Sequence, residues 1–207
     1  MKPRSVILLS GGLDSTVSAA IAVRRTHPLF ALTFDYGHRA ARMEIAASRK
    51  ICRSLKIRHK VTKLPFFGEF GKLTLLGRKK IDSKHLVNTR DVWIPNRNGL
   101  FINIAACYAE YYGAKYIVTG FNREEARQFP DNSEDFLKAV NRCLRYCTLN
   151  KVKVKSYVLK NTKEEIYRLG RRYKAPLDQI YSCYLGGKEM CGKCASCRRL
   201  IEAKKPL

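Results

Sequence analysis

The chain has 207 residues, of which 45% are hydrophobic and 28% are charged, so it is long enough to bury a core as one globular domain. Its 41 lysines and arginines oppose 17 aspartates and glutamates, a formal charge of +24. This balance is explained by a solvated basic surface, and the alternative is a polyanionic partner such as RNA that the positive charge attracts. No apolar run approaches the roughly 18 residues that a membrane span needs, and the first apolar stretch is too short for a signal peptide. We therefore expect a soluble cytoplasmic protein.

In the first half of the chain, short apolar runs alternate with amphipathic stretches, a pattern typical of a parallel α/β sheet. We predict strands at residues 6–9, 29–34 and 58–64, and helices at residues 14–25 and 40–55. The third strand is so charged that we place it near an edge of the sheet. Residues 65–95 are weakly periodic and rich in glycine and proline, which predicts a long surface excursion of the kind from which substrate lids are built.

Regular patterns resume in the second half. We predict helices at residues 98–112, 133–146 and 162–173, and strands at residues 116–119 and 152–159. Ser133 and Thr162 have the chemistry of N-cap residues, and Glu165 stands at the capping-box spacing from Thr162. The helix at 98–112 is expected to be buried through Leu100, Ile104, Cys107, Ala109 and Tyr111. Together these elements predict a doubly wound, mostly parallel sheet of five strands with helices on both faces.

The segment SGGLDST at residues 10–16 joins the first predicted strand to the first predicted helix. Gly11 and Gly12 allow the backbone to approach a phosphate, and the start of the helix adds positive potential and hydroxyl donors. Asp14 either caps the helix or holds magnesium between phosphates. No lysine follows the glycines as in a P-loop, and no G-x-G-x-x-G turn is present. A simple turn is the alternative, but the whole string favours ATP, which we assign to Leu8, Leu9, Ser10, Gly11, Gly12, Leu13, Asp14, Ser15, Thr16, Val17 and Ser18.

Four of the eight cysteines lie close together near the C-terminus. Cys183, Cys191, Cys194 and Cys197 follow the pattern C-x7-C-x2-C-x2-C, which predicts a closed, tetrahedral, structural zinc site. An iron–sulfur cluster and a redox-active pair are the alternatives. We expect an ATP-binding domain over residues 1–180 and a zinc-binding segment over residues 181–207 packed on it. The remaining cysteines are predicted to be core residues, namely Cys52, Cys107, Cys143 and Cys147.

The motifs together resemble a known family. SGGLDST resembles the PP-loop of the ATP pyrophosphatase superfamily, which cleaves ATP between its α and β phosphates. The zinc region and the segments FDYGHRA, IPNRN, TGFN and FPDN, at residues 34–40, 94–98, 119–122 and 129–132, resemble those of the QueC family of 7-cyano-7-deazaguanine synthases. The resemblance implies that 7-carboxy-7-deazaguanine, ammonia and ATP yield a nitrile, through adenylate and amide intermediates, with magnesium and zinc as further cofactors. The product of such enzymes feeds the queuosine and archaeosine modifications of tRNA, and we expect a homodimer.

Site residues are assigned on the matched segments. We predict catalytic roles for Asp14, His38 and Arg97, and substrate contacts for Arg97, Asn98, Asn122, Arg127 and Asp131. Asp131 matches the adjacent N–H donors of a guanine-like edge. The alternatives are a simple N-cap for Asn98, a turn residue for Asp131 and a surface residue for His38.

The chain departs from the family where ARQFPDN stands in place of about YSGYPDC. The added Arg127 suits a more anionic or larger acceptor, so the alternative function is an adenylating enzyme that acts on RNA, a nucleic-acid-linked base or a protein. A tRNA-thiolating enzyme fits the basic charge, but a cluster of cysteines committed to metal counts against sulfur transfer. A non-catalytic zinc module that binds nucleic acid leaves SGGLDST unexplained.

Overall fold

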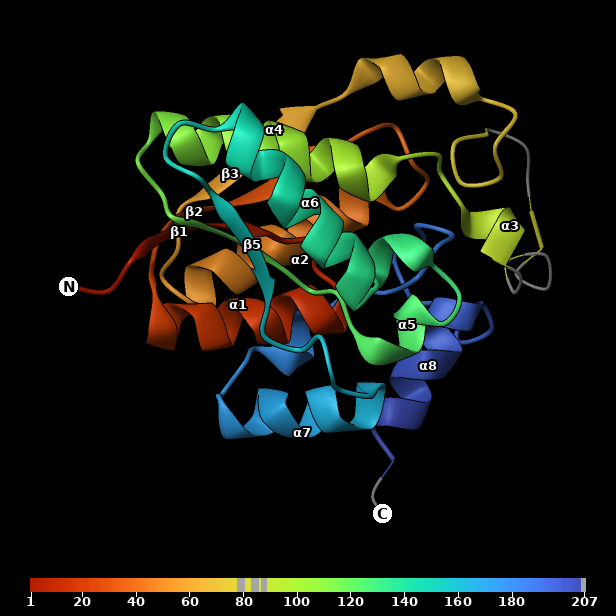
Figure 1. Cartoon of the computed structure of the whole chain (residues 1–207). Coiled ribbons are helices and arrows are strands. Elements are labelled where there is room, and N and C mark those ends of the chain that lie inside the picture. The colour runs from red at the N-terminus through yellow and green to blue at the C-terminus, as the bar shows by residue number, and fades with distance from the viewer. Residues whose placement is uncertain (78–80, 83–85, 87–88, 206–207) are drawn as a thin grey trace.

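A five-stranded parallel sheet forms the centre of the molecule (Figure 1). The computed structural model describes the whole chain except residues 78–80, 83–85, 87–88 and 206–207. The strands lie in the order β3-β2-β1-β4-β5, which confirms the doubly wound class and the edge position of the charged third strand. Their bounds are Arg4–Leu8 (β1), His27–Asp35 (β2), His59–Lys63 (β3), Tyr116–Thr119 (β4) and Lys153–Ser156 (β5). The order reverses between β1 and β4, where open α/β sheets bind their ligands.

Helices cover both faces of the sheet (Figure 1). α4 and α6 lie on one face, and α1 and α2 lie on the other, where α7 packs outside α1. The main helices are α1 (Leu13–Arg25), α2 (Ala41–Ser54), α4 (Arg97–Tyr111), α6 (Glu134–Cys147), α7 (Lys163–Arg172) and α8 (Ala195–Ala203). Short helical turns are η1 (Pro65–Phe70), α3 (Thr89–Val92), α5 (Arg123–Ala126), η3 (Pro130–Asn132) and η4 (Leu177–Gln179). Ser133 caps α6, and Thr162 and Glu165 form the capping box of α7, as predicted.

Some sequence expectations on the elements are wrong. The fifth strand is shorter than the predicted 152–159 because the chain turns after Ser156. In α4, Cys107 is exposed and Tyr111 is 82% exposed. The buried positions are Gly99, Ile102, Ala105, Ala106 and Ala109, of which only Ala109 was predicted. Both sets have helical spacing, but the alanines let α4 approach the sheet closely, so the larger side chains turn outward.

The segment over residues 65–95, which was predicted to run over the surface, is partly buried. In its described part, Phe67, Leu75 and Leu86 are buried in the main core. Val92 of α3 is buried and lines the main cavity, so this segment contributes to the site. Among the residues that the structure describes, no helix has both the length and the apolar character needed to cross a membrane.

Candidate active site

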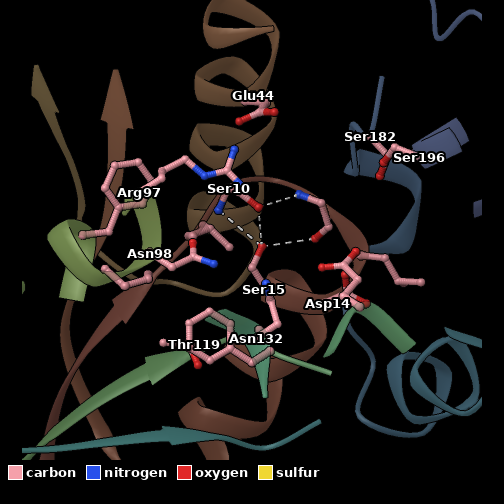
Figure 2. Close-up of a pocket in the computed structure, with 18 of the residues that line it drawn as sticks. Ser10, Asp14, Ser15, Glu44, Arg97, Asn98, Thr119, Asn132, Ser182 and Ser196 are labelled. Carbon is pink, nitrogen blue, oxygen red and sulfur yellow. Dashed lines mark hydrogen bonds between the residues drawn. The ribbon is translucent and has the colours of Figure 1, made fainter. Parts of the chain in front are cut away.

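The loop between β1 and α1 lies at the carboxyl ends of the strands, beside the point where the strand order reverses. α1 begins at Leu13, and its N-cap Gly12 has no side chain to cap it. The alternative that Asp14 caps the helix is therefore wrong, because Asp14 lies inside the first turn. Ser10 and Ser15 face each other with their Oγ atoms 3.1 Å apart (Figure 2). Uncapped amides and two hydroxyls at a helix N-terminus form a site suited to an anion such as phosphate.

The glycines around this loop have different roles. Gly11 has φ +80, and a Cβ there would lie 2.9 Å from the carbonyl oxygen of Glu44. Gly120, which follows β4, would place a Cβ 2.5 Å from the backbone nitrogen of Ser15. By contrast, a Cβ on Gly12 would meet nothing closer than Ser10 Oγ at 3.6 Å. Gly11 and Gly120 thus allow tight backbone packing, and Gly12 leaves space open on the side of the cavity.

A cavity opens over this loop and is lined by α1, α3, α4, the end of β4 and the C-terminal segment. One wall is aromatic, with Phe34 and Phe101 stacked at a centroid distance of 4.2 Å. Another wall comes from residues near the cysteine cluster, among them Ser182, Ser196 and Arg199 (Figure 2). The backbone nitrogen of Tyr181 donates to the Gly11 carbonyl at 2.9 Å. The C-terminal segment therefore packs directly against the predicted ATP loop.

A buried lysine joins two carboxylates at the floor of the cavity. Lys163, at the first position of α7, is 10% exposed and contacts Asp14 Oδ2 and, at 2.7 Å, Glu125 Oε1. Although burial opposes its charge, the two carboxylates raise the pKa of Lys163. Burial also raises the pKa of Asp14 to about 6 against the attraction of Lys163. For Glu125 burial is outweighed by Lys163 and Arg199, which lower its pKa.

Arg97 begins α4 and lines the same cavity. Its Nη1 donates to the hydroxyl of Tyr36 at 3.1 Å. Burial raises the pKa of Tyr36 to about 12, so this partner is neutral at physiological pH. The Tyr36 ring stacks on His38 at 3.9 Å, and His38 Nε2 lies 3.0 Å from Glu44 Oε2. The stacked rings of Tyr36 and His38 support the tyrosine hydroxyl that accepts from Arg97. Because this tyrosine is neutral, it does not neutralise the positive charge of the guanidinium.

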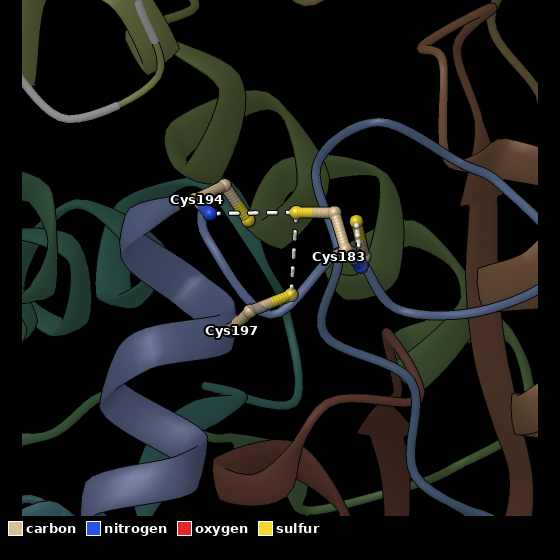
Figure 3. Close-up of side chains that lie close together, drawn as sticks. Cys183, Cys194 and Cys197 are labelled. Carbon is tan, nitrogen blue, oxygen red and sulfur yellow. Dashed lines mark hydrogen bonds between the residues drawn. The ribbon is translucent and has the colours of Figure 1, made fainter. Parts of the chain in front are cut away.

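The four cysteines predicted to hold a metal come together between α8 and the loop before it (Figure 3). The sulfurs of Cys183, Cys191, Cys194 and Cys197 all lie within 4.8 Å of one another, and those of Cys191 and Cys197 are 3.9 Å apart. Four thiolates at about 2.3 Å from one ion are separated by about 3.8 Å in a tetrahedron, so the donor set fits a zinc ion. Although burial alone would raise it, backbone hydrogen bonds from Cys194 and Lys193 lower the pKa of Cys191 to about 7.

Comparison with known proteins decides the family. The family model described as "Queuosine biosynthesis protein QueC" matches residues 4–205. The chain belongs to the QueC family. A 7-cyano-7-deazaguanine synthase from Carboxydothermus hydrogenoformans is 51% identical over 97% of this chain and 98% of its own length. One from Desulforudis audaxviator is 47% identical, over 98% of this chain and 96% of its own length.

The fold of this QueC-family chain also occurs among solved structures. The U34-tRNA thiolase NcsA from Methanococcus maripaludis superposes with a TM-score of 0.55 and 15% identity, covering 98% of this chain and 64% of NcsA. That protein carries a [4Fe-4S] cluster. At this identity the likeness concerns the α/β fold alone.

The cavity gathers many of the predicted site residues of the QueC-family chain, but not all of them. It is lined by Leu8, Leu9, Ser10, Gly12, Leu13, Asp14, Ser15, Arg97 and Asn98. Thr16, Val17 and Ser18 are buried in α1 behind the loop, and Gly11 packs against α2. Ser18 Oγ donates to the Thr119 carbonyl at 2.6 Å. These four residues support the loop and do not face the cavity.

Asn122, Arg127 and Asp131, the predicted substrate residues in the second half of the chain, do not line the cavity. Asn122 is fully buried and its Oδ1 accepts from the amides of Glu124 and Glu125, so it caps α5 and positions Glu125. Arg127 is exposed and does not line the cavity. Asp131 accepts from Asn132 Nδ2 at 3.1 Å, and it is Asn132 that lines the cavity.

Two alternatives and one prediction are settled by local contacts. Asn98 is not an N-cap, because α4 begins after Asn96 and Asn98 Nδ2 donates to the Asp131 carbonyl at 3.4 Å. His38 is 7% exposed and is not a surface residue. Cys52 is buried as expected, but Cys107, Cys143 and Cys147 are exposed. The prediction that all four are core residues is thus wrong for three of them, whose helices present them outward.

Sequence reasoning missed Lys163, Glu125 and Tyr36. The first two come from segments 38 residues apart, so no single motif displayed the pair. A signal was present at Lys163, because a lysine in the first turn of a helix opposes the helix dipole. Local spacing did not show which carboxylate compensates it, because Asp14 lies 149 residues away.

Proposed function

We propose that this QueC-family chain is a 7-cyano-7-deazaguanine synthase. It converts 7-carboxy-7-deazaguanine, ammonia and ATP into 7-cyano-7-deazaguanine. The carboxylate attacks the α phosphate of ATP and pyrophosphate leaves, and ammonia then displaces AMP to give the amide. A second ATP adenylates the amide oxygen, and loss of AMP and a proton gives the nitrile. The observation that carries this proposal is that one cavity holds both the uncapped α1 loop and the half-buried Arg97, whose Nη1 donates to the Tyr36 hydroxyl.

Pyrophosphate binding is assigned to the loop at the start of α1. The free amides of the first turn and the hydroxyls of Ser10 and Ser15 face the cavity side. Donors fixed in advance stabilise the charge that develops on the leaving pyrophosphate without reorganisation. Lys163 lines the same cavity, where it holds the carboxylates of Asp14 and Glu125 in place.

Magnesium binding is assigned to Asp14 and Glu125. Asp14 Oδ1 is buried without a hydrogen-bond partner, and such an atom is a natural ligand for a hard cation. Glu125 and Asp14 both contact Lys163 Nζ, so their carboxylates lie close together. Asp14 and Glu125 would hold a magnesium ion, which would supply positive charge to neutralise the phosphates.

Substrate binding is assigned to the opposite wall. Arg97 offers a guanidinium to the carboxylate of the substrate, because its tyrosine partner is neutral. The stacked rings of Phe34 and Phe101 offer a flat apolar surface to a planar heterocycle. Asn98 and Asn132 line the cavity with amides that match the polar edge of a guanine-like base.

The four-cysteine centre is assigned to zinc in a structural role. Four thiolates leave no open position, so the ion stabilises the fold and does not take part in the chemistry. The centre lies next to the wall that carries Ser196 and Arg199, so its main effect is to shape the cavity. Cytoplasmic location, a homodimer and nucleic-acid contacts of the basic surface remain predictions. Sedimentation and salt-dependent RNA binding test the last two.

An isotope-exchange experiment tests the adenylation step on its own. Labelled pyrophosphate is incubated with the enzyme, ATP and magnesium, without ammonium, and label entering ATP is measured. We expect exchange only when 7-carboxy-7-deazaguanine is present, and loss of exchange in Arg97→Ala. Exchange that is independent of this compound would contradict the proposed acceptor.

A further inference from the structure

Two cysteines outside the four-cysteine centre lie side by side on the surface. Cys143 and Cys147 belong to α6, both are exposed, and their sulfurs are 3.9 Å apart. They stand four residues apart on the helix, so their side chains share one face. Neither residue takes part in the cavity or in the proposed chemistry.

The spacing of the two sulfurs matches that of two ligands on one metal ion. Within the four-cysteine centre, the sulfurs of Cys191 and Cys197 are also 3.9 Å apart, close to the edge of about 3.8 Å in a tetrahedral thiolate complex. A disulfide requires sulfurs at about 2.05 Å and Cβ atoms at about 3.8 Å. Side chains four apart on a helix have Cβ atoms about 5–6 Å apart, so a disulfide would distort α6. A bridging ion fits the helix as it stands.

The surroundings of the pair define the ligand class. Cys107 on α4 interacts electrostatically with Cys147, so a third exposed thiol lies on the same side of the molecule. Desolvation and the neighbouring Cys143 raise the pKa of Cys147 above its ordinary value, which is the opposite of an activated redox nucleophile. Sulfur donors select soft ions over magnesium or calcium. Because both thiols face solvent, the remaining coordination positions stay open.

We propose that Cys143 and Cys147 form a second metal site, open to solvent, that binds one soft, thiophilic ion. Binding releases a proton from each thiol to solvent and forms two metal–sulfur bonds, without oxidation. The site is independent of the four-cysteine centre and of the proposed enzymatic activity.

The test uses Cd²⁺ as the probe on the full-length protein under reducing conditions. After equilibration and removal of free ion, total metal per chain is determined by elemental analysis, because Cd²⁺ also exchanges into the four-cysteine centre. We expect two metal ions per chain for the wild type, and one for Cys143→Ser and for Cys147→Ser. The matched control is Cys107→Ser, which also removes one exposed thiol and is expected to keep two.

A second measurement locates the added ion. Alkylation by iodoacetamide is mapped by mass spectrometry with and without Cd²⁺, and we expect protection of Cys143 and Cys147 together. One metal ion per chain in the wild type would overturn the proposal. Two ions in the Cys143→Ser/Cys147→Ser double variant, or unchanged alkylation of the pair, would do the same.

Discussion

Replacing Lys163 by methionine tests how the floor of the cavity is held together. The methionine keeps most of the apolar stem but removes the charge between Asp14 and Glu125, whose side chains are only 15% and 26% exposed. Breaking a buried ion pair by removing one partner costs about 3–5 kcal/mol, because the remaining charges are left unpaired. In a chain of this size about 1 kcal/mol lowers Tm by roughly 2–4 °C. We therefore expect Lys163→Met to lower Tm at pH 8 by about 6–20 °C.

The matched control is Lys138→Met. Lys138 also contacts two carboxylates, Glu134 at 3.6 Å and Asp135 at 3.3 Å, but its side chain is 67% exposed. Such surface pairs contribute little, so we expect no measurable change in Tm. The Tm difference between Lys163→Met and the wild type should become smaller toward pH 5, where the unpaired carboxyl groups bind protons. Thermal unfolding followed by circular dichroism at both pH values decides this. Equal Tm losses for the two variants at pH 8 would refute the reasoning.

Three further predictions concern the loop, its aspartate and the metal centre. Gly120→Ala forces a Cβ within 2.5 Å of backbone and should lower the free energy of unfolding by about 1–3 kcal/mol. Gly12→Ala should keep the Tm but abolish ATP binding measured by calorimetry. Gly68→Ala, whose Cβ meets nothing within 4 Å, should change neither the Tm nor ATP binding. Because burial raises the pKa of Asp14 from 3.8 to about 6, the folded state binds an extra proton between these values, so the contribution of Asp14 to stability should be largest below pH 4 and should fall as the pH rises to 6. Asp14→Asn should remove this part of the pH dependence in denaturant titrations, and an unchanged dependence would contradict the assignment. Chelation of the metal, or Cys194→Ser, should remove stabilisation on the order of 10 kcal/mol and unfold the segment after residue 181, seen as loss of tryptic resistance there; a fully resistant apo-protein would contradict a structural role.

The parts of the fold predicted best were those with a strong local pattern. The strand–loop–helix around SGGLDST, the capped starts of α6 and α7 and the C-x2-C turns each depend on contacts between neighbours in the chain. The charged edge strand was also predictable, since an edge exposes part of its surface to solvent.

The rest depended on contacts between distant segments. α4 is apolar on more than one face, so periodicity alone could not tell which face meets the sheet. The contact of Lys163 with Asp14, 149 residues away in the chain, leaves no trace in local spacing. Cys143 and Cys147 are exposed because they lie on the outward face of α6. The sequence pattern did not determine which face of this helix would point outward.

The most direct test of the proposed function follows the whole reaction. Purified enzyme is incubated with ATP, magnesium, ammonium and 7-carboxy-7-deazaguanine, and the nucleotides and base-derived products are followed by mass spectrometry. We expect the amide first and then the nitrile, with AMP formed and no ADP. AMP without any change in the base, or ADP in place of AMP, would contradict it.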